Sequence, residues 1–122
     1  MFGSLFSALV AASFLGLGAG ALVAPRALSE TYGLPVDGPT GIAYVRALGA
    51  RDAILGLLIA AFLVRGQRDA LATTVALSSL VGASDFVTVA GERGTAVPLS
   101  LAIHGTGTLG LLAVAALVRA GV

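Results

Sequence analysis

The sequence predicts an all-α integral membrane protein, a four-helix bundle whose helices run up-down-up-down. Hydrophobic residues make up 57% of the 122 residues and charged residues only 11%, which is less than half of the roughly 25% typical of soluble domains. The mean hydropathy is +1.02. The charged residues also gather in short segments between long uncharged stretches. This pattern is typical of a multi-pass membrane protein.

Four stretches are long enough to cross a bilayer, at about residues 2–24, 41–64, 70–90 and 96–118. Each has roughly 20 residues or more, which matches a hydrocarbon core about 30 Å thick at about 1.5 Å per residue. Pro25 and Arg26 end the first span, and Pro98 falls in the first turn of the fourth, where a missing N–H costs little. Short connections make neighbouring spans antiparallel. The four spans are expected to form one domain over residues 1–122.

The longest connection, residues 25–40 (PRALSETYGLPVDGPT), is rich in Pro and Gly. It predicts a turn-rich loop with a short interfacial helix around Arg26–Tyr32. Tyr32 and Tyr44 are expected in the headgroup layer, where amphipathic rings are favoured. No Lys or Arg precedes the first apolar stretch, so we expect it to be retained as a span and not cleaved as a signal peptide.

Charge and cysteine content exclude several classes of function. The net charge is +1 and the chain has no Lys, which argues against nucleic acid as a partner. Zero Cys excludes thiol catalysis, disulfides and thiolate metal sites. His104 is the only histidine, so no usual set of metal ligands is available. We therefore expect neither a metal nor another cofactor such as haem.

The arginines also set the expected orientation. Arg65, Arg68 and Arg119 fall on one side of the predicted bundle, and Arg26 and Arg93 on the other. Cytoplasmic loops carry the excess of basic residues. Both termini are therefore expected in the cytoplasm.

Small residues recur every four positions along the first span. The series is Ser4, Ala8, Ala12, Gly16, Gly20 and Ala24. Small side chains let membrane helices approach closely. We expect this stripe to pack within the bundle, and a homo-oligomer through the Ser4/Ala8/Ala12/Gly16/Gly20 stripe is the alternative.

Five ionisable residues lie inside the spans. They are Arg46, Arg51 and Asp52 in the second span, Asp85 in the third and His104 in the fourth. Charges at such depth cost several kcal/mol unless they are paired or hydrated, and they are functional by default. Ser78 and Thr108 extend the polar stripes on which Asp85 and His104 lie.

Depth predicts which of these groups meet. At about 1.5 Å per residue, all five fall in the same half of the bundle. Arg46 and Asp85 are expected at one height, as an ion pair, and Arg51, Asp52 and His104 at a level closer to the middle. Arg51 and Asp52 lie about 100° apart around the helix, so we expect them to face different neighbours. One would bond His104 and the other a backbone carbonyl or Ser78.

Two segments carry a resemblance to a known family. They are YGLP at 32–35 and RALGARDAILGL at 46–57, supported by Asp85 in the third span. The chain resembles small four-helix integral membrane proteins of unknown function, loosely akin to DoxX-like membrane proteins. The resemblance covers nearly the whole chain and rests on a GxRDxxxG core, formed by Gly49, Arg51, Asp52 and Gly56. It implies the four-helix bundle and the importance of this motif, and no established reaction.

The leading hypothesis is a site that binds a small, largely apolar molecule with a polar head, with acid/base chemistry as a further step. Asp52, Asp85 and His104 are the catalytic candidates, as proton donors or acceptors. The ligand-binding candidates are Arg46 and Arg51, as stabilisers of an anion or oxyanion, together with Ser78 and Thr108.

Three alternatives remain open beside this hypothesis. In the first, the charged groups are ion pairs that fix helix register. In the second, the protein is an oligomeric transporter or proton-coupled permeation protein. In the third, it is a structural subunit of a membrane complex. The half of the bundle opposite the charges offers few polar residues, among them Ser4, Ser7, Thr73 and Thr74. That asymmetry counts against a channel.

The first prediction tests the topology. Reporters fused at Gln67 and at the C-terminus should lie on the same side of the membrane, opposite a reporter inserted near Asp37, because each span reverses the direction of the chain. Accessibility of the three reporters in sealed vesicles measures this. Gln67 and Asp37 appearing on one side would end the four-span topology.

Overall fold

The computed structural model describes all residues 1–122 and consists of helices joined by short connections. The helices are α1 (Phe2–Val23), α2 (Pro25–Tyr32), α3 (Gly38–Val64), α4 (Arg68–Arg93) and α5 (Pro98–Ala120). Four of them, all except α2, are long and apolar enough to cross a membrane. The predicted fold class, an all-α membrane bundle, is confirmed. The short helix expected around residues 26–32 is α2.

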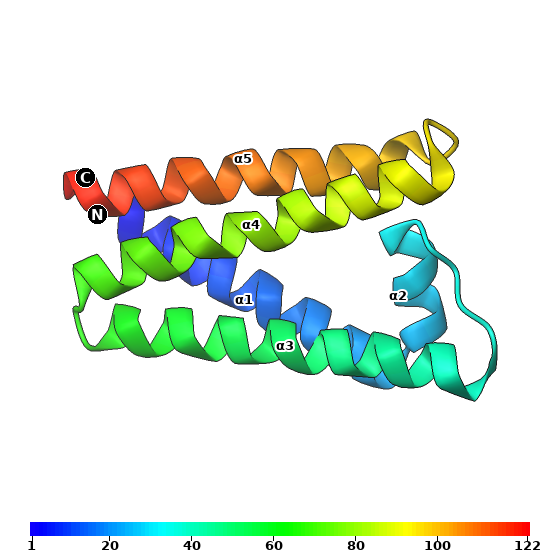
Figure 1. Cartoon of the computed structure of the whole chain (residues 1–122). Coiled ribbons are helices and arrows are strands. Elements are labelled where there is room, and N and C mark those ends of the chain that lie inside the picture. Colours follow the sequence, from blue (N-terminus) through cyan, green and yellow to red (C-terminus); the bar gives the residue numbers. More distant parts are fainter.

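The four long helices form two antiparallel pairs (Figure 1). α1 packs mainly on α3, and α4 packs mainly on α5, with smaller contacts between the pairs. The ribbons of α3 and α4 are close at the turn that joins them and separate toward the other end, where α2 lies (Figure 1). The two chain ends meet at the opposite end from α2, where the Gly3 N–H donates to the Val122 carbonyl at 2.7 Å.

Apolar packing is concentrated toward the end that holds the termini. The core cluster has nine buried residues: Ala11, Ile59, Leu71, Ala72, Val75, Leu111, Val114, Ala115 and Val118. Large apolar side chains such as Leu9, Leu57, Leu80 and Leu109 are exposed on the outside. An outward apolar surface is what a helix facing lipid requires, because lipid tails are as apolar as the core.

Glycines set the close approach of α1 and α3. A Cβ added at Gly49 would lie 2.5 Å from the Ala21 Cβ and 2.9 Å from the Gly18 carbonyl oxygen. A Cβ at Gly56 would lie 2.9 Å from the carbonyl oxygen of Ala11. Only Gly fits at such distances, so the two glycines of the GxRDxxxG motif are the surface on which α1 packs.

The expected four-residue stripe of α1 is not the packing face. Ser4, Ala8, Ala12 and Gly16 are exposed and Gly20 is only partly buried, whereas the buried residues of α1 are Gly3, Ser7, Ala11, Gly18 and Ala21. The buried series Gly3, Ser7 and Ala11 also repeats every four residues, and it lies one residue, or about 100°, away from the predicted stripe. Four-residue spacing alone therefore does not decide which of two neighbouring faces turns toward the bundle.

The second prediction concerns the α1–α3 contact. Gly49→Ala should lower the thermal midpoint in detergent, with a cost of about 1–3 kcal/mol, because the new methyl group meets fixed backbone atoms. The control is Gly110→Ala in α5, where nothing lies within 4 Å of the added Cβ. There the better helix propensity of Ala should leave the midpoint unchanged or raise it. Equal midpoints for both variants would contradict the packing described.

Candidate functional site

The site is built around the C-terminal end of α2. This helix begins at Pro25, the first helical position, and ends at Tyr32, where it is capped by Gly33, whose φ of 102° is left-handed. Proline suits the first turn because its missing N–H needs no partner there, and glycine adopts left-handed backbone without strain. The loop beyond is tied back by the Val36 N–H, which donates to Ser29 Oγ at 3.1 Å. These end residues and the loop hydrogen bond together hold α2 at the end of the bundle where the ribbons of α3 and α4 separate.

Side chains from α4 and α5 satisfy the last carbonyls of α2. Ser100 Oγ donates to the Thr31 carbonyl at 2.9 Å, and His104 Nε2 lies 2.9 Å from the Tyr32 carbonyl oxygen. A carbonyl only accepts hydrogen bonds, so this contact requires the proton on Nε2. Arg93 Nη1 reaches the Gly33 carbonyl at 3.5 Å. These donors replace water for carbonyls that a helix end leaves without intrahelical partners.

Asp85 connects α2 and α3 to α4. The Tyr32 hydroxyl donates to Asp85 Oδ1 at 2.8 Å. Arg51 Nη2 lies 3.9 Å from Asp85 Oδ2, a distance of an ion pair without a direct hydrogen bond. Arg51 in turn binds Asp52, with Nε at 3.0 Å and Nη2 at 2.9 Å from Oδ1. Tyr32, Arg51, Asp52 and Asp85, which we call the polar cluster, therefore form one connected chain of contacts.

The members of the polar cluster differ in exposure. The side chains of Asp52 and Asp85 are 18% and 16% exposed, whereas that of Arg51 is 37% exposed. Tyr32 is half-buried, and its ring makes an edge-to-face contact with His104 at a centroid distance of 4.7 Å. Burial, and then the hydrogen bond to Asp85, raises the pKa of the Tyr32 hydroxyl well above its usual range. The phenol is thus held in its neutral, donating form.

The expected Arg46–Asp85 ion pair is wrong. Arg46 is exposed, and its Nε reaches the Leu22 carbonyl of α1 at 3.4 Å. Leu22 belongs to the last turn of α1, whose carbonyls lack helical partners. Arg46 and Arg51 lie about 140° apart around α3, so only one of them faces α4. Arg51 is that residue.

Two further expected contacts are also corrected. Arg51 and Asp52 were expected to face different neighbours, but the long guanidinium arm spans the angle between them and they bind each other. His104 was expected to bond one of them, and it bonds the Tyr32 carbonyl instead. Asp85 was also expected at the level of Arg46 and not at that of Arg51, yet it lies 3.9 Å from Arg51. Depth counted along each helix therefore did not predict the partners, which depend on helix rotation.

Ser78 and Thr108, expected to bind a ligand, bond to their own helices. Ser78 Oγ donates to the Thr74 carbonyl at 2.8 Å, and Thr108 Oγ1 donates to the His104 carbonyl at 2.8 Å. Short hydroxyl side chains readily form such bonds within a helix. Their hydroxyls are therefore engaged away from the polar cluster.

Sequence reasoning missed Tyr32 as a member of the cluster and assigned it to the headgroup layer. It also missed Arg93 and the role of Ser100. The spacing of Ser100 and His104, four residues apart on one helix face, was the available signal for a docked neighbour. No three His, Cys, Asp or Glu side chains gather to hold a metal ion.

Chemically, the polar cluster offers a neutral phenol, two carboxylates and one guanidinium in contact. Such groups bind hydrogen-bonding head groups and exchange protons with them.

Comparison with known families gives one finding: the family model described as "Domain of unknown function (DUF4267)" matches residues 11–118. No curated protein and no solved structure matches the chain.

The third prediction uses the phenol as a probe of the cluster. The chain has two tyrosines, so in a Tyr44→Phe background the alkaline absorbance titration reports Tyr32 alone. Tyr32 should stay protonated beyond pH 10, near which a free phenol ionises. Because the pKa of Tyr32 is higher in the folded state than in the unfolded state, its contribution to the free energy of unfolding is fully present below about pH 10. That contribution falls as the pH rises above this value.

Asp85→Asn replaces a charged acceptor by a neutral one, so the Tyr32 titration should move back toward that of a free phenol. Glu92→Gln, at an exposed acid of the same helix, is the matched control and should leave the titration unchanged. Normal ionisation of Tyr32 in the folded Tyr44→Phe protein would contradict the docking of α2.

Proposed function

We propose that this chain, which belongs to the family described as "Domain of unknown function (DUF4267)", binds a small, largely apolar molecule with a polar head at the polar cluster. The protein is a multi-pass membrane protein with four long apolar helices. The apolar part of such a molecule would lie among the lipid-facing side chains, and its head would contact the charged groups.

The observation that carries the proposal is the incomplete burial of Arg51. Asp85 is hydrogen-bonded to Tyr32, and Asp52 is bound by two nitrogens of Arg51. Arg51 keeps the most exposed side chain of the three charged residues, at 37%. A guanidinium open to a membrane interior gains from a polar partner, because exposed charge is costly there. A bound head group would supply this partner.

Charge decides which head group fits best. The polar cluster has one positive side chain, Arg51, and two carboxylates, Asp52 and Asp85, so its formal charge is +1 − 2 = −1. Arg46, which would have made the set neutral, lies outside it. Arg51 can only donate hydrogen bonds, whereas ionised carboxylates can only accept them. The cluster therefore favours a head group that both accepts and donates hydrogen bonds, such as an alcohol or an uncharged amine. It disfavours an anionic head.

Acid/base chemistry is the second part of the proposal. Asp52 and Asp85 would accept a proton from the head group. Tyr32 donates its single hydroxyl proton to Asp85, so it would hold that carboxylate in place and accept a hydrogen bond from the head group through its own oxygen. The His104 ring contacts the Tyr32 ring, and its Nε2 donates to the Tyr32 carbonyl, so in this proposal His104 positions the phenol. These roles replace the anion-binding role expected for a pair of arginines.

The residues of the GxRDxxxG motif have two roles in this proposal, helix packing and ligand binding. Gly49 and Gly56 face α1 with no room for a side chain, while Arg51 and Asp52 enter the polar cluster. The loose likeness to DoxX-like membrane proteins adds no reaction to it. The transport alternative has less support, because the apolar core cluster fills the part of the bundle toward the termini. A polar path through that part would have to cross buried Ile59 and Val75.

The fourth prediction tests the choice of head group. A long-chain alkylamine should raise the thermal midpoint of the purified protein, and an alkyl sulfonate of equal chain length should not. At a ligand concentration about 100 times the Kd, binding stabilises by about 2.7 kcal/mol. Asp52→Asn makes the cluster formally neutral and should abolish most of the response to the amine. Asp37→Asn, at an exposed residue before α3, should retain it.

Two outcomes would overturn the proposal. An amine response of equal size in wild type and Asp52→Asn would show that the amine only partitions into the micelle. A larger response to the sulfonate than to the amine would show that the formal charge of the cluster does not select the head group. An amine response that is present in wild type and in Asp37→Asn, and lost in Asp52→Asn, supports the site.

A further inference from the structure

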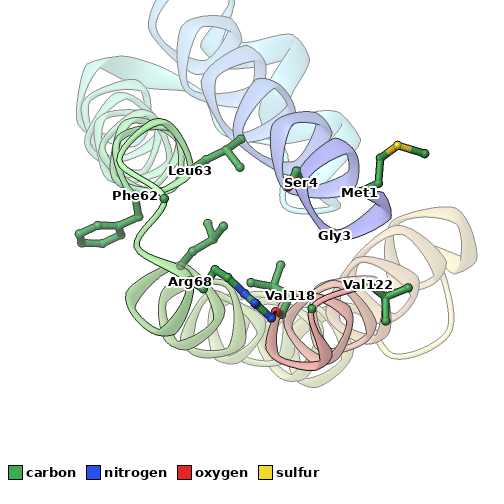
Figure 2. Close-up of a pocket in the computed structure, with 11 residues that line it drawn as sticks. Met1, Gly3, Ser4, Phe62, Leu63, Arg68, Val118 and Val122 are labelled. Atoms are coloured by element: carbon green, nitrogen blue, oxygen red, sulfur yellow. Dashed lines mark hydrogen bonds between the residues drawn. The ribbon is translucent and has the colours of Figure 1, made fainter.

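A second polar site lies at the other end of the bundle from the polar cluster. It is a pocket of about 160 Å³ between the ends of α1, α3, α4 and α5. Figure 2 shows Ser4, Leu63, Arg68 and Val118 around this pocket, with Phe62 directed away from it. A cavity of about 150 Å³ is large enough to hold a benzene molecule, so this pocket has room for a group of the size of a phosphate.

Arg68 is the charged group of this pocket. Its Nη2 donates to the Val118 carbonyl at 3.2 Å, a bond that holds the guanidinium over the last turn of α5. A guanidinium has five N–H donors, and this bond uses one of them. The planar, forked arrangement of the others suits two oxygens of one phosphate group. Ser4 adds a hydroxyl to the lining.

The surroundings of the pocket favour an anion. Arg65, Arg68 and Arg119 lie at this end with a single acid, Asp69, so its side chains sum to +3 − 1 = +2. Two helices, α1 and α4, begin at this end, and two, α3 and α5, end there, so their opposite dipoles offset one another and the arginines supply the positive charge. At the α2 end, Arg26, Arg46 and Arg93 are balanced by Glu30, Asp37 and Glu92. The positive field is therefore confined to the end with the pocket.

The position of the pocket identifies the source of the anion. It lies at the ends of four helices that are long and apolar enough to cross a membrane, where lipid head groups are found. Its other lining includes Leu63, Leu71 and Val118, which suit the first carbons of a lipid. Basic pockets between membrane helices are known binding places for anionic head groups.

We infer that this pocket binds the phosphate group of an anionic phospholipid, with Arg68 as its main ligand. The guanidinium pairs with two phosphate oxygens while it stays bonded to Val118, and the Ser4 hydroxyl donates to the same group. The site is separate from the polar cluster, so it stands or falls independently of the proposed function.

The test is native mass spectrometry of the full chain in detergent, titrated with phosphatidylglycerol, phosphatidylcholine or inorganic phosphate. Wild type should retain phosphatidylglycerol in preference to phosphatidylcholine. Arg68→Gln should bind phosphatidylglycerol about tenfold more weakly, through loss of charge-assisted hydrogen bonds. Arg65→Gln, which removes the same charge at the same end but does not line the pocket, is the matched control and should bind like wild type.

Ser4→Leu is the second variant, because Arg68→Gln also removes the bond to Val118 and could fail to fold. Ser4→Leu keeps that bond and fills the pocket, so it should lose phosphatidylglycerol as Arg68→Gln does. Equal phosphatidylglycerol binding by Ser4→Leu and wild type would overturn the inference, as would an equal loss in Arg65→Gln and Arg68→Gln. Saturation of the Arg68-dependent site by inorganic phosphate, with no preference for the lipid, would overturn the lipid source.

Discussion

The carboxylate of Asp85 is the contact on which the α2 end of this bundle depends. A charged carboxylate inside a membrane span costs several kcal/mol unless other groups compensate it. Asp85 lies on α4, and its two oxygens face Tyr32 of α2 and Arg51 of α3. Compensation therefore requires α2 to fold back over the bundle and α3 to present one particular face. Three elements that are distant in sequence are placed by one side chain.

The bundle divides its interior between apolar and polar packing. Toward the termini, nine buried apolar residues hold the four helices together. Toward α2, the two helix pairs separate (Figure 1), and polar contacts take over. Ser100, His104 and Arg93 bind the carbonyls at the end of α2. The short helix thus completes the bundle where long helices alone would leave polar groups unsatisfied.

The two ends of the molecule differ in charge as well as packing. The polar cluster has a formal charge of −1 from Arg51, Asp52 and Asp85. The opposite end carries Arg65, Arg68 and Arg119 against Asp69. The two ends therefore present opposite net charge, carboxylate at the polar cluster and arginine at the end with the termini. Glycine packing between α1 and α3 leaves Arg51 and Asp52 on the side of α3 that enters the cluster.

Sequence alone determined the properties that depend on composition and on the rise of a helix. Hydropathy located four spans, Pro and Gly marked the loop with its short helix, and counting residues placed Arg51, Asp52, Asp85 and His104 in one half of the bundle. Only the tertiary structure decided which groups meet, because contact depends on the rotation of each helix about its axis. Arg46 and Arg51 are five residues apart, which corresponds to about 140° around the helix. Because of this angle, Arg51 faces Asp85 and Arg46, the expected partner, does not. Tyr32 entered the cluster because the loop folds back, a long-range event that no local pattern records.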